Sequence, residues 1–320
     1  ELELKGDSGI FRNFVTNLDK ISKANSRVFI TGSSGSGKTT AAKYIHQNSR
    51  QAAGNFISVD CSTSNQNELE RFLFGFEDNS SLQEVGAFEK ANGGTIYLDK
   101  VSELPMDLQS KLLKVLLENS ITRLGSSKKV SVDVRFISAT SSELLERAKN
   151  KSFREDLFQR LSVVPIKVPN LRDRVDDIPI LAKHFVEQLS LANDLAYREF
   201  TDEALTFLQS MNWPGNIRQL RNMIERVLIL GEPSDKIKVE ELMSSEIKSQ
   251  EKDDKVNLIP SELANMSLRE AREIFERDYL ILQINRFGGN ISKTAAFVEM
   301  ERSALHRKLK SLGINSGQKN

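Results

Sequence analysis

The sequence predicts an α/β fold, a parallel sheet with flanking helices, followed by all-α regions toward the C-terminus. The first observation is a series of short apolar runs that alternate with amphipathic helical stretches between residues 28 and 168. The second is helical apolar spacing from about residue 176 onward. The apolar runs lack strict apolar–polar alternation, as expected for strands buried on both faces, and they lie at 28–30, 56–59, 95–98 and 134–137.

These patterns divide the chain into five segments, and its length agrees with two or three domains. The first segment is predicted to be helical because Ile10, Phe14 and Leu18 recur at helical spacing. A charged stretch poor in apolar anchors separates the last two helical regions and is typical of a linker. The segments are a helical lead-in at 1–27, an α/β subdomain at 28–170, a helical lid at 171–244, a linker at 245–260 and a helical domain at 261–320.

Composition and cysteine usage exclude several classes of protein. The single cysteine, Cys61, permits no internal disulfide, which fits a reducing cytoplasm. His46, His184 and His306 lack the spacing of metal ligands, so no zinc site is expected. No apolar run is long enough to span a bilayer, and no signal segment is evident. We therefore expect a cytoplasmic protein without a membrane partner. Because the chain begins with Glu1 rather than Met, it is interpreted as a piece of a longer protein.

A phosphate-binding loop is predicted directly after the first apolar run. Its glycines allow the backbone N–H groups to face phosphate oxygens, and the following helix presents its positive end to the anion. Lys38 is expected to reach the terminal phosphates of ATP, and the Thr39 hydroxyl to ligate Mg²⁺. The residues assigned to the nucleotide are Gly32, Ser33, Ser34, Gly35, Ser36, Gly37, Lys38, Thr39 and Thr40.

A carboxylate for the Mg²⁺ shell is expected at the end of a second buried strand. The run GGTIYLDK supplies it as Asp99, which follows four β-forming residues. An aspartate at such a position also forms turns, but its occurrence together with the phosphate loop favours the metal role. Asp99 and Thr39 are therefore the predicted Mg²⁺ ligands.

The order of several motifs resembles the AAA+ domain of bacterial enhancer-binding proteins, the activators of sigma-54 polymerase. The motifs are GSSGSGKT, GGTIYLDK, VDVRFISATS, FREDLFQRLSVVPIKVP and WPGNIRQLRN, and the resemblance covers roughly residues 6–245. Together with the C-terminal region, it is strongest with the NtrX-type nitrogen-response regulators. It implies an ATP-dependent ring, usually a hexamer, with RNA polymerase as a partner and a sensor kinase acting through an upstream receiver domain.

The resemblance also assigns three arginines by position. Arg154 and Arg160 correspond to the fingers that reach the γ-phosphate of a neighbouring subunit, and Arg218 corresponds to the sensor that contacts the nucleotide of its own subunit. A guanidinium near the γ-phosphate offsets the charge that develops as the bond breaks. An alternative for the first two is a solvated helix face.

Two departures from the family pattern affect catalysis. The family places a glutamate after the strand aspartate to polarise water, whereas this chain has Lys100, whose ammonium cannot accept a proton. The family asparagine that bonds this glutamate corresponds to Asp60. We therefore predict that Asp60 and Lys100 form a salt bridge beside the γ-phosphate, as a switch pair. Glu103 is a candidate substitute base, and Ser141 replaces the usual asparagine of the first sensor.

The loop through which family members contact sigma-54 is also expected to be missing. The stretch from Phe74 to Glu89 carries only Gly86-Ala87-Phe88 in place of the GAFTGA motif, and this lies too close to the following strand. We interpret these residues as the start of the helix before that strand. Remodelling of sigma-54 polymerase is therefore not expected, and ATP hydrolysis is expected to be weak or absent.

The C-terminal region predicts a helix-turn-helix. A long helix at 268–287 is followed by a short helix at 292–298, a turn and a helix at 302–312, in which Leu305, Leu309 and Leu312 form one apolar stripe. This stretch resembles the Fis-type module of the family, which implies a dimer on a two-fold operator of double-stranded DNA. From Arg286 onward seven Lys and Arg oppose Glu299 and Glu301. The expected DNA contacts are Arg302, Ser303, His306, Arg307, Lys308 and Lys310.

Three functions remain open from the sequence. The first is a DNA-binding regulator in which ATP controls assembly with little hydrolysis. The second is an active AAA+ ATPase that remodels RNA polymerase holoenzyme, with Glu103 or another acid as the base. The third is a DNA-binding protein with a relic loop that binds no nucleotide. Turnover, nucleotide affinity and particle mass distinguish them.

Overall fold

The structure is a computed structural model that divides into two compact units, residues 1–247 and 248–320. The predicted linker and most of the predicted helix at 268–287 lie outside the described residues. No helix in the described part of the chain is long and apolar enough to cross a membrane. The described residues are 4–63, 65–78, 83–141, 152–233, 235–244, 272, 276–277, 279–281, 284, 291–298 and 300–312.

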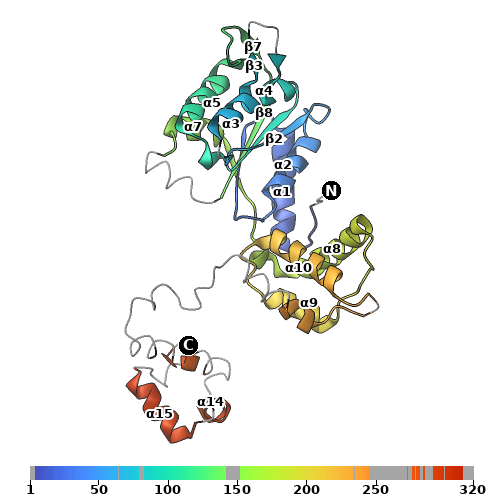
Figure 1. Ribbon diagram of the computed structural model, residues 1–320, viewed down its shortest axis with the longest axis vertical. Helices are drawn as coiled ribbons and strands as arrows, with labels where there is room; N and C mark the ends of the chain where they lie inside the picture. The colour runs from blue at the N-terminus through green and yellow to red at the C-terminus, as the bar shows by residue number, and fades with distance from the viewer. Residues whose placement is uncertain are drawn as a thin grey trace. The chain divides into compact units, whose positions relative to one another are not determined.

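A five-stranded sheet forms the centre of the first unit, and all its strands run parallel (Figure 1). The four predicted runs are confirmed as strands. The fifth strand was not predicted. It lies half-exposed at the edge of the sheet, and its sequence, VPIK, contains no continuous run of β-forming apolar residues. In spatial order the strands are β2 (Phe56–Asp60), β5 (Thr95–Asp99), β8 (Arg135–Thr140), β1 (Val28–Thr31) and β9 (Val164–Lys167).

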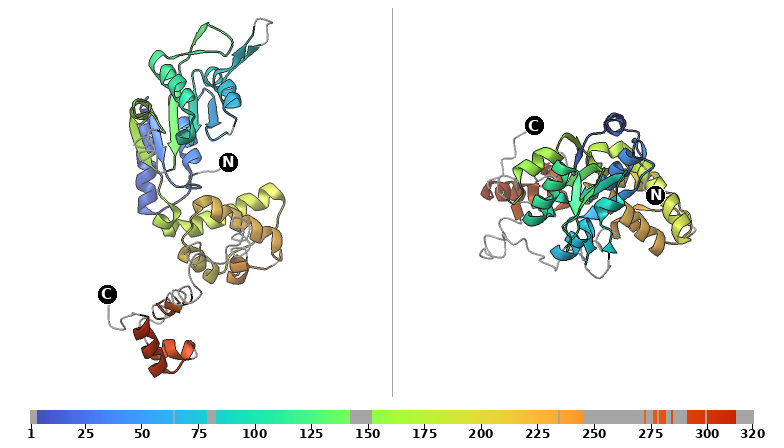
Figure 2. Two further views of the ribbon diagram at one scale, coloured as in Figure 1. Left: turned by 60° about the vertical axis from the view of Figure 1, so that its left-hand side comes forward. Right: turned by 90° about the horizontal axis from the view of Figure 1, so that it is seen from above.

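Helices cover both faces of this sheet (Figure 2). On one face Phe29, Ile96 and Phe136 point into a core closed by helices α3, α4, α5 and α7. On the other face the alternate residues Ile30 and Tyr97 pack against α1 and α2. The helices are α1 (Gly9–Lys23), α2 (Lys38–Gln47), α3 (Gln66–Phe74), α4 (Ala87–Lys90), α5 (Met106–Glu118) and α7 (Glu155–Leu161). Because helices cover both faces, the central strands β1, β5 and β8 are buried along most of their length, as the sequence indicated.

Short elements complete the α/β part of the unit. The strands β3 (Phe76–Glu77) and β4 (Gln83–Glu84) form a small antiparallel hairpin, as do β6 (Ser120–Thr122) and β7 (Lys129–Ser131). A 3-10 turn, η1 (Val101–Glu103), follows β5. The prediction that Gly86-Ala87-Phe88 begins the helix before β5 is confirmed, because Gly86 caps α4.

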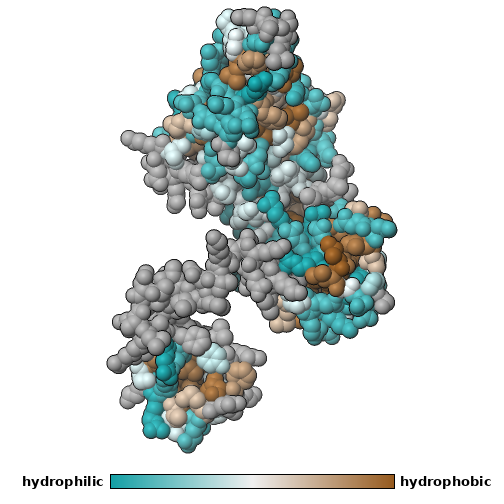
Figure 3. Space-filling view, in the orientation of Figure 1, coloured by the Kyte–Doolittle hydropathy of each residue, from teal (hydrophilic) through white to brown (hydrophobic). Residues whose placement is uncertain are grey.

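The helical lid has its own apolar core around Trp213. Its elements are η2 (Leu171–Asp177), α8 (Ile178–Asn193), α9 (Asp202–Ser210) and α10 (Asn216–Leu230). The indole nitrogen of Trp213 donates to the carbonyl of Leu208, so this large side chain is buried without an unsatisfied donor. Large apolar side chains of α8 and α10 remain exposed, including Leu191 and Leu230, and Figure 3 shows hydrophobic surface on the lid.

A buried carboxylate of the lid accepts hydrogen bonds from the residues that precede α1. Asp177 accepts hydrogen bonds from the backbone N–H groups of Asp7 and Ser8 at 2.6 and 2.7 Å, and from the Ser8 hydroxyl at 2.8 Å. Arg174 lies 3.7 Å from the same carboxylate and stacks over the Phe11 ring. A carboxylate at this position also complements the positive end of α1. The lid therefore anchors the lead-in helix through one fully buried side chain.

The second unit contains the predicted short helix and recognition helix, α14 (Ile291–Phe297) and α15 (Arg302–Ser311). Leu305 and Leu309 are buried against Leu280 and Ala295, and Leu312 is partly buried beside them. The predicted apolar stripe of α15 is therefore confirmed as its core-facing side.

Replacing Asp177 is expected to destabilise the first unit. Asp177→Ala removes three hydrogen bonds and leaves Arg174 without its buried carboxylate, at a cost of about 3 kcal/mol. Urea unfolding of the full chain, followed by fluorescence of the single tryptophan, Trp213, measures this free energy of unfolding. The exposed neighbour Asp176 provides the control, since Asp176→Ala should change stability by about 0.5 kcal/mol or less. Equal effects of the two substitutions would contradict the proposed anchor.

Candidate nucleotide site and nucleic-acid interface

The carboxyl edge of the parallel sheet gathers the predicted nucleotide residues. In the sheet register Asp60, the last residue of β2, lies beside Asp99, the last residue of β5. The next strands along this edge end at Thr140 and Thr31 and are paired there. Ser141 follows the first of these, and the phosphate loop follows the second. Ligand sites of parallel α/β sheets form at this edge.

The phosphate loop connects β1 to α2 as predicted. Lys38, the first residue of α2, folds back so that its Nζ donates to the carbonyls of Gly32 at 2.8 Å and Ser33 at 3.0 Å. Burial lowers the pKa of Lys38, and the positive charges of Arg218 and Lys100 lower it further, while Asp99 opposes them. A bound anion would therefore stabilise the charged form of this lysine.

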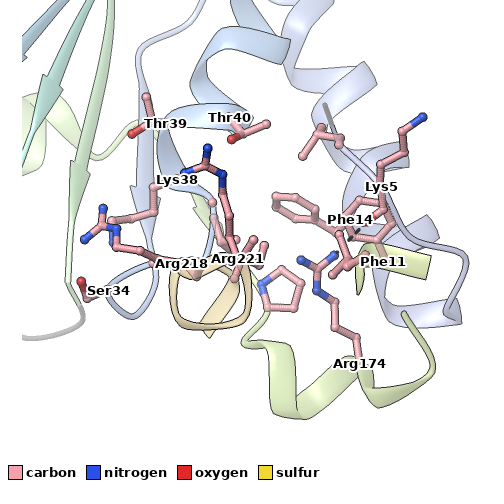
Figure 4. Close-up of a pocket in the computed structure, with 18 of the residues that line it drawn as sticks. Lys5, Phe11, Phe14, Ser34, Lys38, Thr39, Thr40, Arg174, Arg218 and Arg221 are labelled. Atoms are coloured by element: carbon pink, nitrogen blue, oxygen red, sulfur yellow. Dashed lines mark hydrogen bonds between the residues drawn. The ribbon is translucent and has the colours of Figure 1, made fainter. Parts of the chain in front are cut away.

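A cavity of about 320 Å³ lies over the loop and is lined by both the α/β part and the lid. Figure 4 shows Lys38, Thr39, Arg218 and Ser34 at one end of this cavity and the rings of Phe11 and Phe14 at the other. Leu181, Phe185 and Ile217 of the lid also line it. The cavity therefore has a cationic end and an apolar end, which suits a nucleotide with its phosphates on the loop and its base against the aromatic rings.

The lid is bonded to the phosphate loop by a buried asparagine. Asn216 donates from Nδ2 to the carbonyl of Ser34 at 3.0 Å and accepts on Oδ1 from the N–H of Leu171 at 2.9 Å. Beside it, Gly35 adopts φ +72°, and a Cβ there would lie 2.2 Å from the carbonyl oxygen of Gly215. The loop and the lid thus approach at backbone distance, which only glycine allows.

Oxygen donors for Mg²⁺ lie in the same cavity. Thr39 and Asp99 both line it, and hydroxyl and carboxylate oxygens are ligands that Mg²⁺ prefers. The Thr39 hydroxyl is 3.4 Å from that of Tyr97, whose pKa is raised by burial and by the negative charge of Asp99. The described residues contain no cluster of three His, Cys, Asp or Glu that could hold a metal alone. A magnesium ion here would need phosphate oxygens to complete its shell.

The predicted contact between Asp60 and Lys100 is present. The Nζ atom of Lys100 lies 2.9 Å from Oδ2 of Asp60 and 3.0 Å from the Ser62 hydroxyl, which itself donates to Oδ1 of Asp60 at 2.7 Å. Burial raises the pKa of Asp60, but hydrogen bonds from Ser62 and Lys100 outweigh it and leave the pKa below its ordinary value. The pair is therefore intact at neutral pH and is lost in acid as Asp60 takes up a proton.

Exposure limits what this pair contributes to stability. The side chains of Lys100 and Asp60 are 50% and 53% exposed, and exposed ion pairs contribute roughly 0–1 kcal/mol. Such a pair can be rearranged at little cost when another anion approaches Lys100. Lys100 also has a left-handed backbone, with φ 51°, and it lines the cavity together with Lys38 and Asp99.

The remaining predicted catalytic residues lie at different places. Arg218 lines the cavity. Arg154 caps α7 and is bonded to Asp156 and, at 3.1 Å, to the Ser110 hydroxyl, while Arg160 is exposed on the same helix. Glu103 is exposed on η1 and does not line the cavity among the described residues, so the geometry gives no support to its role as a substitute base.

Several of the predicted DNA contacts are exposed on α15 in the second unit. Ser303, His306 and Arg307 are exposed, opposite the buried leucines, and Arg302 begins the helix. Lys308 forms an ion pair with Glu276, whose pKa is lowered by hydrogen bonds from Lys308 and Arg272. Lys310 lies on the same helix, but its side chain is outside the described residues. The exposed surface of α15 is thus basic, with Lys308 partly neutralised from within the unit.

Sequence reasoning missed several residues in and around the candidate site. Arg221 follows Arg218 by three positions on α10, a spacing that places both on one helix face. Phe11 and Phe14 were visible only as the apolar side of the lead-in helix. Ser62 follows Asp60 by two positions, the spacing of a local side-chain turn, and this signal was available in the sequence.

The parallel sheet, the phosphate loop and the bonded helical lid define an AAA+ domain. Family comparison agrees: the sigma-54 interaction domain matches residues 4–167, the AAA+ ATPase lid domain matches 172–258, and the Fis family of bacterial regulatory proteins matches 271–312. The chain is 45% identical to the nitrogen assimilation regulatory protein NtrX of Azorhizobium caulinodans, covering 97% of this chain and 68% of that protein. The chain belongs to the NtrX family of transcription regulators.

Other relatives and solved structures agree with this assignment. A putative NtrX-like response regulator of Rickettsia typhi is 43% identical, over 98% of this chain and 67% of its own length. Structures of NtrX from Brucella abortus in complex with ADP and with ATP are 44% and 43% identical to the chain, each with a TM-score of 0.71. Each comparison covers 98% of this chain and 70% of the other.

The contact between Gly35 and the lid predicts that a methyl group there impairs nucleotide binding. Gly35→Ala combines an unfavourable φ with a collision against Gly215, so its cost should exceed the roughly 1–2 kcal/mol of a left-handed alanine. Gly93 has φ +74° and nothing within 4 Å of an added Cβ, so Gly93→Ala isolates the backbone cost. Chemical unfolding and titration with ATP should show a larger destabilisation, and an affinity loss of at least about tenfold, only for Gly35→Ala. Similar behaviour of the two variants would argue against a tight contact between loop and lid.

Proposed function

We propose that this chain is a transcription regulator that binds Mg²⁺ and ATP in the cavity and double-stranded DNA with α15. ATP serves mainly as an assembly signal and is hydrolysed slowly or not at all. The observation that carries the proposal is the ion pair of Lys100 with Asp60, because Lys100 lines the cavity at the position where the family has a catalytic carboxylate.

Nucleotide binding is supported by the residues that line the cavity. The N-terminus of α2, Lys38 and Arg218 converge on one end, and Thr39 and Asp99 supply oxygen ligands for Mg²⁺. The backbone of the predicted loop, from Gly32 to Thr40, supplies the N–H groups. The Brucella abortus relative is described in complex with ADP and with ATP, which agrees with the same ligand class here.

Slow hydrolysis follows from the chemistry of the pair. Activation of water requires a group that accepts a proton, and a lysine ammonium has no acceptor. Asp60 is a carboxylate, but its low pKa makes it a weak base, and both of its oxygens are already bonded to Ser62 and Lys100. When ATP binds, its terminal phosphate can compete with Asp60 for Lys100, which gives the pair its role as a switch.

Assembly is the proposed use of the bound nucleotide. Arg154 and Arg160 are offered as fingers toward the nucleotide of a neighbouring subunit, which requires a head-to-tail ring, usually a hexamer. Arg154 would then exchange its bonds with Asp156 and Ser110 for phosphate oxygens. An upstream receiver domain with a cognate sensor kinase would supply the signal, in a cytoplasmic regulator with a dimeric DNA-binding module.

The hairpin in place of the sigma-54 loop argues against remodelling of the polymerase. Strands β3 and β4 pair Phe76 with Glu84 and Glu77 with Gln83, so only residues 78–82 separate them. Arg71 donates two hydrogen bonds to the carboxylate of Glu84 in β4, each with a nitrogen–oxygen distance of 2.6 Å, and these bonds stabilise the hairpin. We infer that RNA polymerase, where it is a partner, is contacted in some other way.

Restoring the family residues should create ATP hydrolysis. The double variant Asp60→Asn, Lys100→Glu supplies both a general base and the amide that orients it, so its turnover should exceed that of the wild type by at least about tenfold. Phosphate release with Mg²⁺ and ATP measures turnover, and mass photometry measures assembly. Lys100→Ala is the control, because it removes the cation without adding a base and should stay slow.

Three outcomes distinguish the functions. ATP-dependent assembly with slow turnover supports the proposal. Wild-type turnover at a rate ordinary for AAA+ proteins, abolished by Lys38→Ala, would instead establish an active ATPase. Absence of any affinity for ATP would leave a DNA-binding protein with a relic loop.

Substitutions on α15 test the DNA surface. Arg307→Ala should weaken binding to a duplex selected by the wild-type chain by roughly tenfold, since a guanidinium contact to a base contributes about 1–3 kcal/mol. Lys308→Ala should have a smaller effect, because Glu276 already pairs with this lysine. Fluorescence anisotropy at several salt concentrations measures both affinities and their salt dependence. An unchanged affinity for Arg307→Ala would remove the assignment of this residue.

A further inference from the structure

Arg221 is a second lid arginine in the nucleotide cavity, and no motif assigned it a role. It lies on α10 three residues after Arg218, so the two side chains leave the helix on the same face. Figure 4 shows that they diverge: Arg218 extends toward Ser34 and Lys38, whereas Arg221 extends toward Thr40. Thr40 lies in the first turn of α2, whose N-terminus favours an anion.

The position of Arg221 along the cavity indicates which part of a nucleotide it meets. In Figure 4 its guanidinium lies between the cationic end, marked by Lys38, and the aromatic end, marked by Phe14. A nucleotide that spans the cavity places its base among the apolar side chains and its terminal phosphate at the cationic end. The phosphate attached to the ribose then lies between these ends, beside Thr40 and Arg221.

The charge balance of the cavity supports an anion at this place. Among the described residues that line the cavity, Asp99 is the single carboxylate, whereas Lys5, Lys38, Lys100, Arg174, Arg218 and Arg221 are cationic. Two of these cations have carboxylates outside the cavity, Asp60 for Lys100 and Asp177 for Arg174. The ion pair of Arg221 with Glu225 is long, at 4.0 Å, and both side chains are substantially exposed, so it holds the guanidinium weakly.

We propose that Arg221 binds the phosphate nearest the ribose and thereby fastens the lid onto any nucleoside diphosphate or triphosphate. This inference rests on the proposed ATP binding and adds a division of labour between the two lid arginines. Arg221 contributes equally to the binding of ADP and ATP, because both carry the phosphate that it contacts. Arg218, at the other end of the loop, contributes more to ATP because it faces the position of the terminal phosphate.

Paired affinity measurements for ADP and ATP test this division. Isothermal titration of the full chain with Mg²⁺ should show that Arg221→Ala weakens both nucleotides by the same factor, roughly 10- to 100-fold for a charge-assisted hydrogen bond. Arg218→Ala should weaken ATP more than ADP. Arg221→Lys should retain part of the affinity, because it keeps the charge but loses the two-pronged geometry.

Controls separate a local role from a general defect. Glu225→Ala removes the weak partner of Arg221 and should leave both affinities unchanged or slightly higher. Unfolding of Arg221→Ala without nucleotide should match the wild type, since the side chain is not part of the buried core. Wild-type affinity in Arg221→Ala, or a loss confined to ATP, would overturn the assignment.

The same titrations distinguish this inference from the proposed function. If the wild type binds ATP and Lys38→Ala does not, nucleotide binding stands whatever Arg221→Ala shows. If the wild type binds neither ADP nor ATP, the proposed function and the role of Arg221 fail together.

Discussion

The parallel pairing of β2 with β5 is the constraint on which the candidate site depends. Because the strands run in the same direction and in register, their last residues, Asp60 and Asp99, lie side by side at one edge. The residue after Asp99 is then within reach of Asp60, and a lysine at that position meets a carboxylate at 2.9 Å. An antiparallel pairing would place these chain ends at opposite edges of the sheet.

The lid makes this edge into a cavity. Asn216 bonds both to the phosphate loop, at Ser34, and to the start of the lid, at Leu171, and Gly35 meets the lid backbone without an intervening side chain. Asp177 anchors the lead-in helix to the lid, so Phe11 and Phe14 become part of the apolar wall. Three chain segments that are far apart in sequence therefore line one cavity.

A cation where the family has an acid changes the relation between binding and catalysis. The loop, Lys38 and the two lid arginines can all favour a triphosphate, and Lys100 adds to this field without offering a base. We therefore propose that affinity for the nucleotide and its hydrolysis are separable in this chain. In the proposed function, this exposed ion pair would respond to the terminal phosphate of ATP through the contacts of Lys100 with Asp60 and Ser62.

The sequence by itself determined four of the five strands of the parallel sheet and the chemistry of the phosphate loop. Both depend on local spacing: buried parallel strands contain short runs of apolar residues, and a P-loop is contiguous in the chain. The contact of Asp60 with Lys100 was also predictable, because paired changes to opposite charges imply proximity. The edge strand β9 escaped notice because half-exposed residues weaken its apolar pattern.

Only the tertiary structure decided which distant residues share the cavity. Nothing in local spacing brings Phe11, Phe14 and Arg221 to one cavity, because they meet where the lid, through Asp177, is bonded to the start of the lead-in helix. The structure also distinguished residues that are close together in the sequence. Glu103 and Lys100 are three residues apart on either side of the turn after β5, but of the two only Lys100 lines the cavity.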